Sequence, residues 1–125
     1  MHENEISGDI LNVCIQIHRG LGPGLFESIY EEVLAYELVK LGYSVERQKA
    51  IDVEWDGHNL GVGFRADLVV ESLIIIELKS IENLQAVHFK QLNTYLKLTG
   101  MRVGLLINFN EMLLKDGFHR VINGY

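Results

Sequence analysis

The chain has very little cysteine and proline, and it has no long apolar run. It has a single cysteine, Cys14, so no disulfide can form within the chain, and a single proline. Its longest uninterrupted apolar run, residues 73–76, is far shorter than the roughly 20 residues needed to cross a bilayer. The acidic, polar N-terminus has no signal-peptide pattern. We therefore expect a cytoplasmic protein without a membrane span, in which Cys14 is a buried thiol.

Positive charge is also scarce. Lys and Arg number 11 against 17 Asp and Glu, which gives a formal net charge of −6. This balance argues against broad, sequence-independent binding of nucleic acid, because such binding depends on neutralising phosphates. It does not exclude a contact with phosphate through a metal ion. Acidic ligands gathered at a metal site make the formal charge more negative than that of the metal-loaded protein.

Length and hydrophobic periodicity predict one α/β domain over residues 1–125. Apolar residues at helical spacing predict helices over residues 5–18, 25–41 and 83–98. Alternating or continuous apolar runs predict strands over residues 43–55, 58–70, 73–79, 102–109 and 118–122. Because the first of these runs is long enough for two strands, the expected order is α-α-β-β-β-β-α-β-β. The helix between the third and fourth runs requires a parallel crossover, so we expect a mixed sheet with helices on both faces.

A group of charged residues inside an apolar hairpin calls for a functional explanation. Asp67, Glu77 and Lys79 lie in two runs made otherwise of Leu, Val and Ile. Burying such a charge costs several kcal/mol unless a partner or a metal compensates for it. Two carboxylates with the backbone carbonyl of Leu78 are a ligand set suited to Mg²⁺. A lysine beside that ion could hold or deprotonate an attacking water.

This interpretation carries a geometric condition. Glu77 and Lys79 are two residues apart, so they point to the same face of a strand. A two-residue turn at 71–72 would place Asp67 opposite Ile76 and direct its carboxylate away from Glu77. We therefore predict a three-residue turn or a bulge that places Asp67 opposite Glu77. Carboxylates on opposite faces of the sheet would exclude the metal site.

Two helical segments offer further site residues. In the second helix, the pattern Gly24-x-x-Glu27-x-x-Tyr30 places Glu27 and Tyr30 on neighbouring positions of one face. In the third helix, Gln91 and Tyr95 lie one turn apart. His88 lies three residues before Gln91 on the same side. We expect these helical positions to contribute to the same site.

Together these segments resemble the GxxExxY proteins, a group of small bacterial and archaeal proteins in the PD-(D/E)XK nuclease superfamily. The resemblance rests on GLFESIY, the D…ExK hairpin, QLNTYL and GLLINF, in that order, and covers about residues 10–122. It implies a restriction-endonuclease-like core, with a sheet of about four strands flanked by helices. The superfamily name calls for proline before the aspartate, and this chain has Ala66 there.

The resemblance also implies roles for the candidate residues. Asp67 and Glu77 would bind Mg²⁺ or Mn²⁺, and Lys79 would assist the water. Glu27 would be an additional ligand or an acid next to the ligands, and Gln91 and Tyr95 would orient the site or touch DNA. The implied activity is hydrolysis of phosphodiester bonds in DNA, and a homodimer would help such a small protein to grip its substrate.

Other functions remain open at this stage. A catalytically inactive nuclease fold could serve as a binding or regulatory module in a larger assembly. A phosphodiesterase acting on RNA or nucleotides would use the same residues. The hairpin charges could also be a structural ion pair, Glu27 a helix N-terminal acid, and Gln91 and Tyr95 part of an amphipathic helix. His88 could satisfy a local hydrogen bond.

Three further residues are given structural interpretations. Glu31 and Glu32 follow Glu27 in the first turns of the second helix, and we expect both to be solvated. Trp55 precedes the turn at Asp56 and could be either an exposed stacking residue or an edge of the core.

Overall fold

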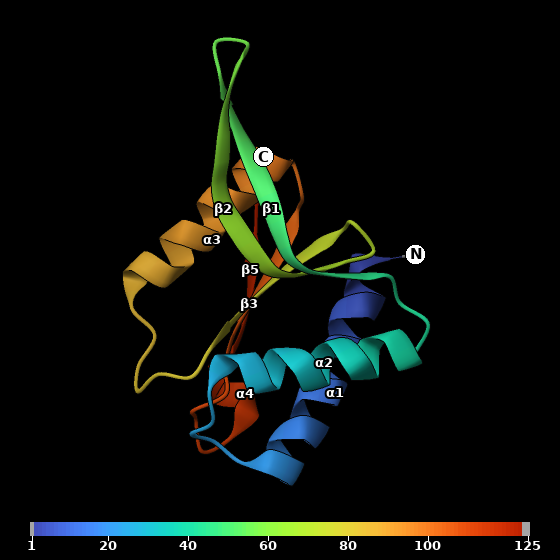
Figure 1. The fold of residues 1–125 in the computed structure, drawn as a ribbon. Coiled ribbons are helices and arrows are strands. Elements are labelled where there is room, and N and C mark those ends of the chain that lie inside the picture. The colour runs from blue at the N-terminus through green and yellow to red at the C-terminus, as the bar shows by residue number, and fades with distance from the viewer. Residues whose placement is uncertain (1, 124–125) are drawn as a thin grey trace.

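A computed structural model describes residues 2–123. It contains a five-stranded sheet in the order β1-β2-β3-β4-β5, with packed helices on both faces (Figure 1). In chain order the elements are α1 (Glu3–Leu21), α2 (Glu27–Lys40), β1 (Val45–Trp55), β2 (His58–Val70), β3 (Ile74–Lys79), α3 (Ala86–Thr99), β4 (Val103–Asn108), α4 (Leu114–Gly117) and β5 (Phe118–Ile122). The predicted α/β class with a mixed sheet is confirmed.

The order of elements differs from the predicted one in two places. The segment predicted to hold two strands is one continuous strand, β1, because it pairs with β2 from end to end. A four-residue helix, α4, follows β4 and was not predicted. The observed order is therefore α-α-β-β-β-α-β-α-β. The ends of the remaining helices and strands lie within three residues of the predicted ones.

The two central strands divide the core into two clusters. Ile74 and Ile76 of β3 pack with α1 and α2, whereas Ile75 between them packs with α3. β3 pairs in parallel with β4, and both are covered on two faces, which explains their nearly continuous apolar sequences.

Cys14 is fully buried in the cluster between the sheet and helices α1 and α2, and this burial raises the pKa of its thiol. The predicted buried thiol is confirmed.

Helix α1 owes its position to an apolar stripe at helical spacing. Ile6, Ile10, Val13 and Ile17 are buried on one side of this helix, against α2 and the sheet. The opposite side is polar. In the described part of the chain, no helix is long and apolar enough to cross a membrane.

The β1–β2 hairpin extends beyond the rest of the sheet (Figure 1). Its closing turn has positive φ at Asp56 and Gly57, 53° and 78°, which matches the twist of the two strands. The register shifts in the part of β2 that contains Gly61 and Gly63. A Cβ atom at Gly63 would lie 2.2 Å from Cγ2 of Val53.

Candidate metal centre and active site

The turn between β2 and β3 brings Asp67 opposite Glu77. The antiparallel ladder ends at Leu68 and Ile76, and residues 71–73 form the turn. Continued by one residue, this register places Asp67 opposite Glu77. The predicted three-residue turn is confirmed, and with it the geometric condition for a shared carboxylate site.

Hydrogen bonds fix the direction of the Asp67 carboxylate. The backbone N–H of Leu78 donates to Oδ2 at 2.8 Å, and Nε2 of Gln48 donates to Oδ1 at 3.2 Å. In an extended strand the N–H and C=O of one residue point to the same side. The carbonyl of Leu78 therefore faces the side on which Asp67 lies, and the expected oxygen ligands converge there.

Glu77 is the most unusual ionisable group of the site. Its side chain is only 9% exposed, and Oε1 is buried without a hydrogen-bond partner among the described residues. Burial, followed by the adjacent Asp67 carboxyl group, raises the pKa of Glu77 to about 9, while Lys79 acts in the opposite direction. A cation between the two carboxylates would satisfy the orphan oxygen and offset their repulsion.

Lys79 does not form the structural ion pair that was the alternative explanation. Among the described residues, no salt bridge joins its ammonium to Asp67 or Glu77. Its charge nevertheless lowers the pKa of Glu77, so the ammonium lies near that carboxyl group. Lys79 is therefore placed to act on a third group at the end of β3.

Glu27 lies at the edge of this site, as the first residue of α2. Its Oε2 accepts a hydrogen bond from the N–H of Ser80 at 3.0 Å, and Ser80 Oγ donates to the carbonyl of Leu25 at 2.6 Å. These bonds tie the start of α2 to the residue after Lys79. Across residues 2–123, no group of three or more His, Cys, Asp or Glu side chains is arranged to hold a metal, and the hydrogen bond that Glu27 makes here is the one with Ser80.

Tyr30 holds the loop that precedes Glu27. The side chain is fully buried, and its ring stacks on Phe109 with centroids 4.3 Å apart. Its hydroxyl donates to the carbonyl of Gly22 at 2.6 Å and accepts from the N–H of Leu25 at 3.1 Å. Tyr30 therefore lies in the core behind the site, where it positions the start of α2.

The candidates on α3 divide into two groups. The ring of Tyr95 stacks on Phe64 at 3.7 Å, and burial, Glu77 and Asp67 raise its pKa, so its hydroxyl lies near the carboxylates. Gln91 is exposed one turn earlier. His88 instead accepts from the N–H of Gln85 at 2.9 Å, within a capping box at the start of α3. The local hydrogen bond, and not a substrate contact, is what the structure gives for His88.

Comparison with known proteins agrees with this arrangement. The family model of the PD-(D/E)XK nuclease superfamily matches residues 4–121. The chain belongs to this superfamily. No significant match is found among curated proteins or among solved structures. PD-(D/E)XK nucleases generally use divalent metals and act on nucleic acid, and the oxygen ligands around Asp67 and Glu77 suit such an ion.

Sequence reasoning missed one acidic residue of this PD-(D/E)XK site. Glu31 was expected to be solvated, but it is only 7% exposed. It accepts hydrogen bonds from Nε and Nη2 of Arg47, at 3.2 and 3.1 Å, and from Nε2 of Gln48 at 2.6 Å. Glu32, in contrast, is exposed as expected and pairs with Nη1 of Arg47 at 2.7 Å. The burial of Glu31 could have been predicted from its position in the helix, because Glu31 continues the buried stripe of Leu34 and Leu38.

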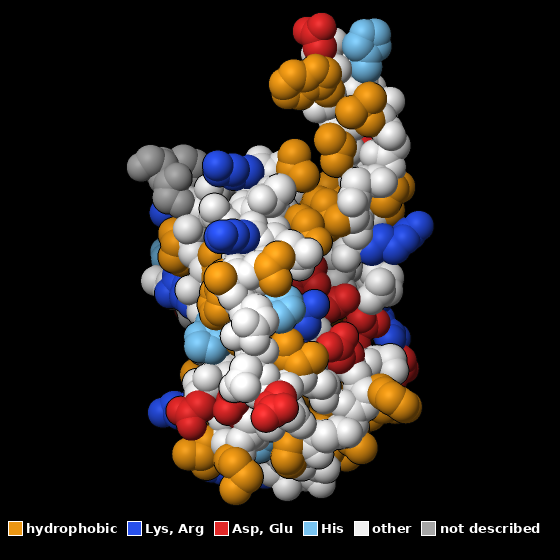
Figure 2. Space-filling view, turned by 90° about the vertical axis from the view of Figure 1, so that its left-hand side faces the viewer, with side chains coloured by type: hydrophobic (Ala, Val, Ile, Leu, Met, Phe, Trp, Pro, Cys, Tyr) orange, Lys and Arg blue, Asp and Glu red, His pale blue; other side chains and the backbone are white. Residues whose placement is uncertain are grey.

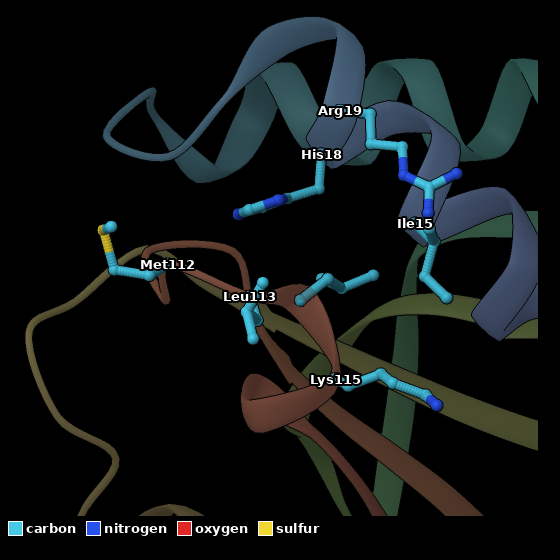
Figure 3. Close-up of a pocket in the computed structure, with 7 residues that line it drawn as sticks. Ile15, His18, Arg19, Met112, Leu113 and Lys115 are labelled. Carbon is cyan, nitrogen blue, oxygen red and sulfur yellow. The ribbon is translucent and has the colours of Figure 1, made fainter.

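The surface around the site is acidic and hollowed. Acidic side chains gather below the projecting hairpin (Figure 2). A hollow of about 540 Å³ adjoins Glu27, and its lining residues are Gly24, Leu25, Phe26, Glu27, Ser28, Ser80 and Asn110. A hollow of about 420 Å³ lies between α1 and the segment around α4 (Figure 3). Beside it, Nε2 of His18 donates to the carbonyl of Glu111 at 2.8 Å. None of the candidate PD-(D/E)XK residues lines this second hollow.

Proposed function

We propose that the protein is a divalent-metal-dependent nuclease that hydrolyses phosphodiester bonds in DNA. The carboxylates of Asp67 and Glu77 and the carbonyl of Leu78 would hold Mg²⁺ or Mn²⁺. The observation that carries this proposal is the buried Oε1 of Glu77, which has no hydrogen-bond partner among the described residues and lies beside the Asp67 carboxyl group. When bound, the ion supplies Lewis-acid chemistry and offsets negative charge at the phosphate.

The remaining residues act on the water and the substrate. No salt bridge joins Lys79 to a carboxylate within residues 2–123, so its side chain can hold the attacking water or, as the neutral amine, accept a proton from it. Glu27 borders the hollow next to Ser80, where a phosphodiester can approach the end of β3. The hydroxyl of Tyr95 lies near the carboxylates, and Gln91 is exposed one turn away to meet the nucleic acid.

We include in this proposal that the chain is a GxxExxY protein. The two bonds of the Tyr30 hydroxyl to the loop before α2 give the spacing from Glu27 to Tyr30 a physical reason. Gly24 in that loop has φ of 93°, a conformation that favours glycine. The three motif positions thereby act together to place Glu27 beside Ser80.

The proposal is tested by incubating the full chain with single-stranded, double-stranded and branched DNA, and with RNA, in Mg²⁺ or Mn²⁺. We expect cleavage of DNA, and a loss of about 100-fold or more in Asp67→Ala and in Lys79→Ala. Glu54→Ala and Lys97→Ala change exposed residues elsewhere and should keep the wild-type rate. Absence of cleavage by the wild type, or equal rates in all four variants, would reject the nuclease.

One observation favours a second candidate, an inactive nuclease fold that binds a partner. Trp55, Leu60 and Val62 of the projecting hairpin are exposed, and such apolar surface is typical of interaction sites. Metal binding separates the two candidates, because an ion that binds only the folded state must raise the melting temperature. No shift with millimolar Mn²⁺ would favour the binding module, whereas a shift would favour the nuclease.

A further inference from the structure

Gln48 has a backbone conformation that its place in the chain does not explain. Four non-glycine residues among those described have positive φ, and three of them lie in turns. Gln48, with φ of 48°, lies inside strand β1. Its neighbours pair with Leu68 and Ala66, so it stands opposite Asp67. A long side chain rarely adopts this conformation, and such strain persists only where the surroundings fix it.

The strained backbone aims the Gln48 amide at two carboxylates. Nε2 donates to Oε1 of Glu31 at 2.6 Å and to Oδ1 of Asp67 at 3.2 Å. Both protons of the amide nitrogen are therefore used. Since Oδ2 of Asp67 is bonded by the N–H of Leu78, each oxygen of Asp67 has one fixed donor. The rotation of this carboxylate is thereby determined before any cation arrives.

Arg47 and Glu31 hold the amide in place. Glu31 is buried, and Arg47 donates to its Oε2 through two nitrogens, which leaves Oε1 for Gln48. The neutral amide of Gln48, and not the guanidinium of Arg47, is thus the group that donates to Asp67. A guanidinium bonded directly to Asp67 would compete with a cation, whereas a neutral amide orients the carboxylate and leaves its charge available.

We infer that Gln48 is a positioning residue that fixes Asp67 for cation binding, with Glu31 and Arg47 as its anchor. This inference rests on the proposed function, because it concerns the same site. Gln48 does not touch the reacting atoms. It acts through Asp67, to which its amide donates.

The test compares Gln48→Gly with Ser72→Gly. Both substitutions relieve a positive φ, and only the first removes the amide beside Asp67. Titration of each full-length variant with Mn²⁺ should give a dissociation constant raised about tenfold or more in Gln48→Gly and unchanged in Ser72→Gly. Equal affinity for Mn²⁺ in the wild type and in Gln48→Gly would overturn the inference.

A second measurement needs no metal. If Gln48 fixes Asp67, the amide proton of Leu78, which donates to that carboxylate, should exchange about tenfold faster in metal-free Gln48→Gly than in the wild type. Unchanged exchange at Leu78 would contradict the inference. Should Gln48→Gly not fold, Gln48→Asn keeps a residue that tolerates this backbone but shortens the amide, and the same two results are expected of it.

The outcomes separate the inference from the proposed function. A wild type that binds Mn²⁺ and cleaves DNA, with Gln48 variants that match it, refutes only the positioning role. A wild type that neither binds Mn²⁺ nor cleaves refutes the nuclease, and the positioning role falls with it. Faster exchange of the Leu78 amide proton together with weaker Mn²⁺ binding, both confined to the Gln48 variants, supports the positioning role of Gln48.

Discussion

At its base, residues 45–50 and 65–70, the β1–β2 hairpin belongs to the sheet, whereas its arm, residues 51–64, projects beyond it (Figure 1). In the base, the carboxylate of Asp67 has a donor on each oxygen. In the arm, Trp55, Leu60 and Val62 are 76%, 65% and 52% exposed. The same two strands therefore hold a tightly specified polar site at one end and uncovered apolar side chains at the other.

The difference lies in what packs against the two strands. At the base, β3 supplies the backbone N–H of Leu78 and β1 supplies the amide of Gln48, which α2 holds through Glu31, so groups from three elements fix Asp67. Along the arm, no third strand pairs with residues 51–64 within the described chain, and the register shifts twice. A functional site needs its side chains held from several directions. Changes at the base should therefore alter metal binding, and changes in the arm should not.

The largest effect is expected for Glu77→Gln at the base. This variant keeps the shape of the side chain and removes one of the two carboxylates. We expect the Mg²⁺-dependent cleavage rate to fall about 100-fold or more, because an ion ligand is lost. In EDTA at neutral pH, the melting temperature should rise by a few degrees, because a pKa of about 9 means that Glu77 must take up a proton on folding, whereas the neutral amide needs none and can donate to Asp67. A variant that keeps its rate, or melts lower in EDTA, would contradict this reading of the site.

Glu31→Ala tests the anchor of the base. The substitution leaves Arg47 and Gln48 without a buried acceptor, and we expect the free energy of unfolding to fall by about 2 kcal/mol. Glu32→Ala removes the exposed partner of the same guanidinium and should cost about 0.5 kcal/mol or less. Urea denaturation measures the free energy of unfolding of both variants. Equal losses in the two variants would show that Glu31 is no more than a surface ion pair.

Much of the fold and the centre of the site follow from local pattern. The apolar periods give three long helices and the strands, because burial of one face or two leaves a direct trace in the sequence. The three-residue turn could also be predicted. Asp67 and Glu77 had to share a face if they shared a function, and a three-residue turn allows this whereas a two-residue turn does not.

The supporting residues could not be predicted in the same way. The positive φ of Gln48 has no local signature, since glutamine has no preference for that region and is placed there by Glu31 and Asp67, both distant in sequence. Glu31 resembles any solvated acid near a helix start until its alignment with buried leucines is considered. The burial of Tyr30 could not be predicted either, because a motif gives spacing and does not show which side chains point inward.

In the arm, Gly63→Ala should have a smaller and local effect. The added Cβ would meet Cγ2 of Val53, a stiff β-branched side chain, and we expect a cost of about 1 kcal/mol. Backbone amides of residues 51–64 should exchange faster, with Mn²⁺ affinity unchanged. Gly8→Ala on the open surface of α1 is the matched control and should raise stability by about 0.5–1 kcal/mol. Weaker Mn²⁺ binding in Gly63→Ala would mean that the arm and the base are coupled.

Trp55→Ser should have the smallest effect on the isolated chain. The indole lies near the tip of the arm and is mostly exposed, so its loss should change the free energy of unfolding by no more than about 0.5 kcal/mol. Affinity for Mn²⁺ should equal that of the wild type, because no contact links the tip to Asp67. Urea denaturation and Mn²⁺ titration measure the two quantities. A loss above 1 kcal/mol, or a weaker Mn²⁺ site, would contradict the division of the hairpin, since an uncovered side chain can support neither the core nor the carboxylates.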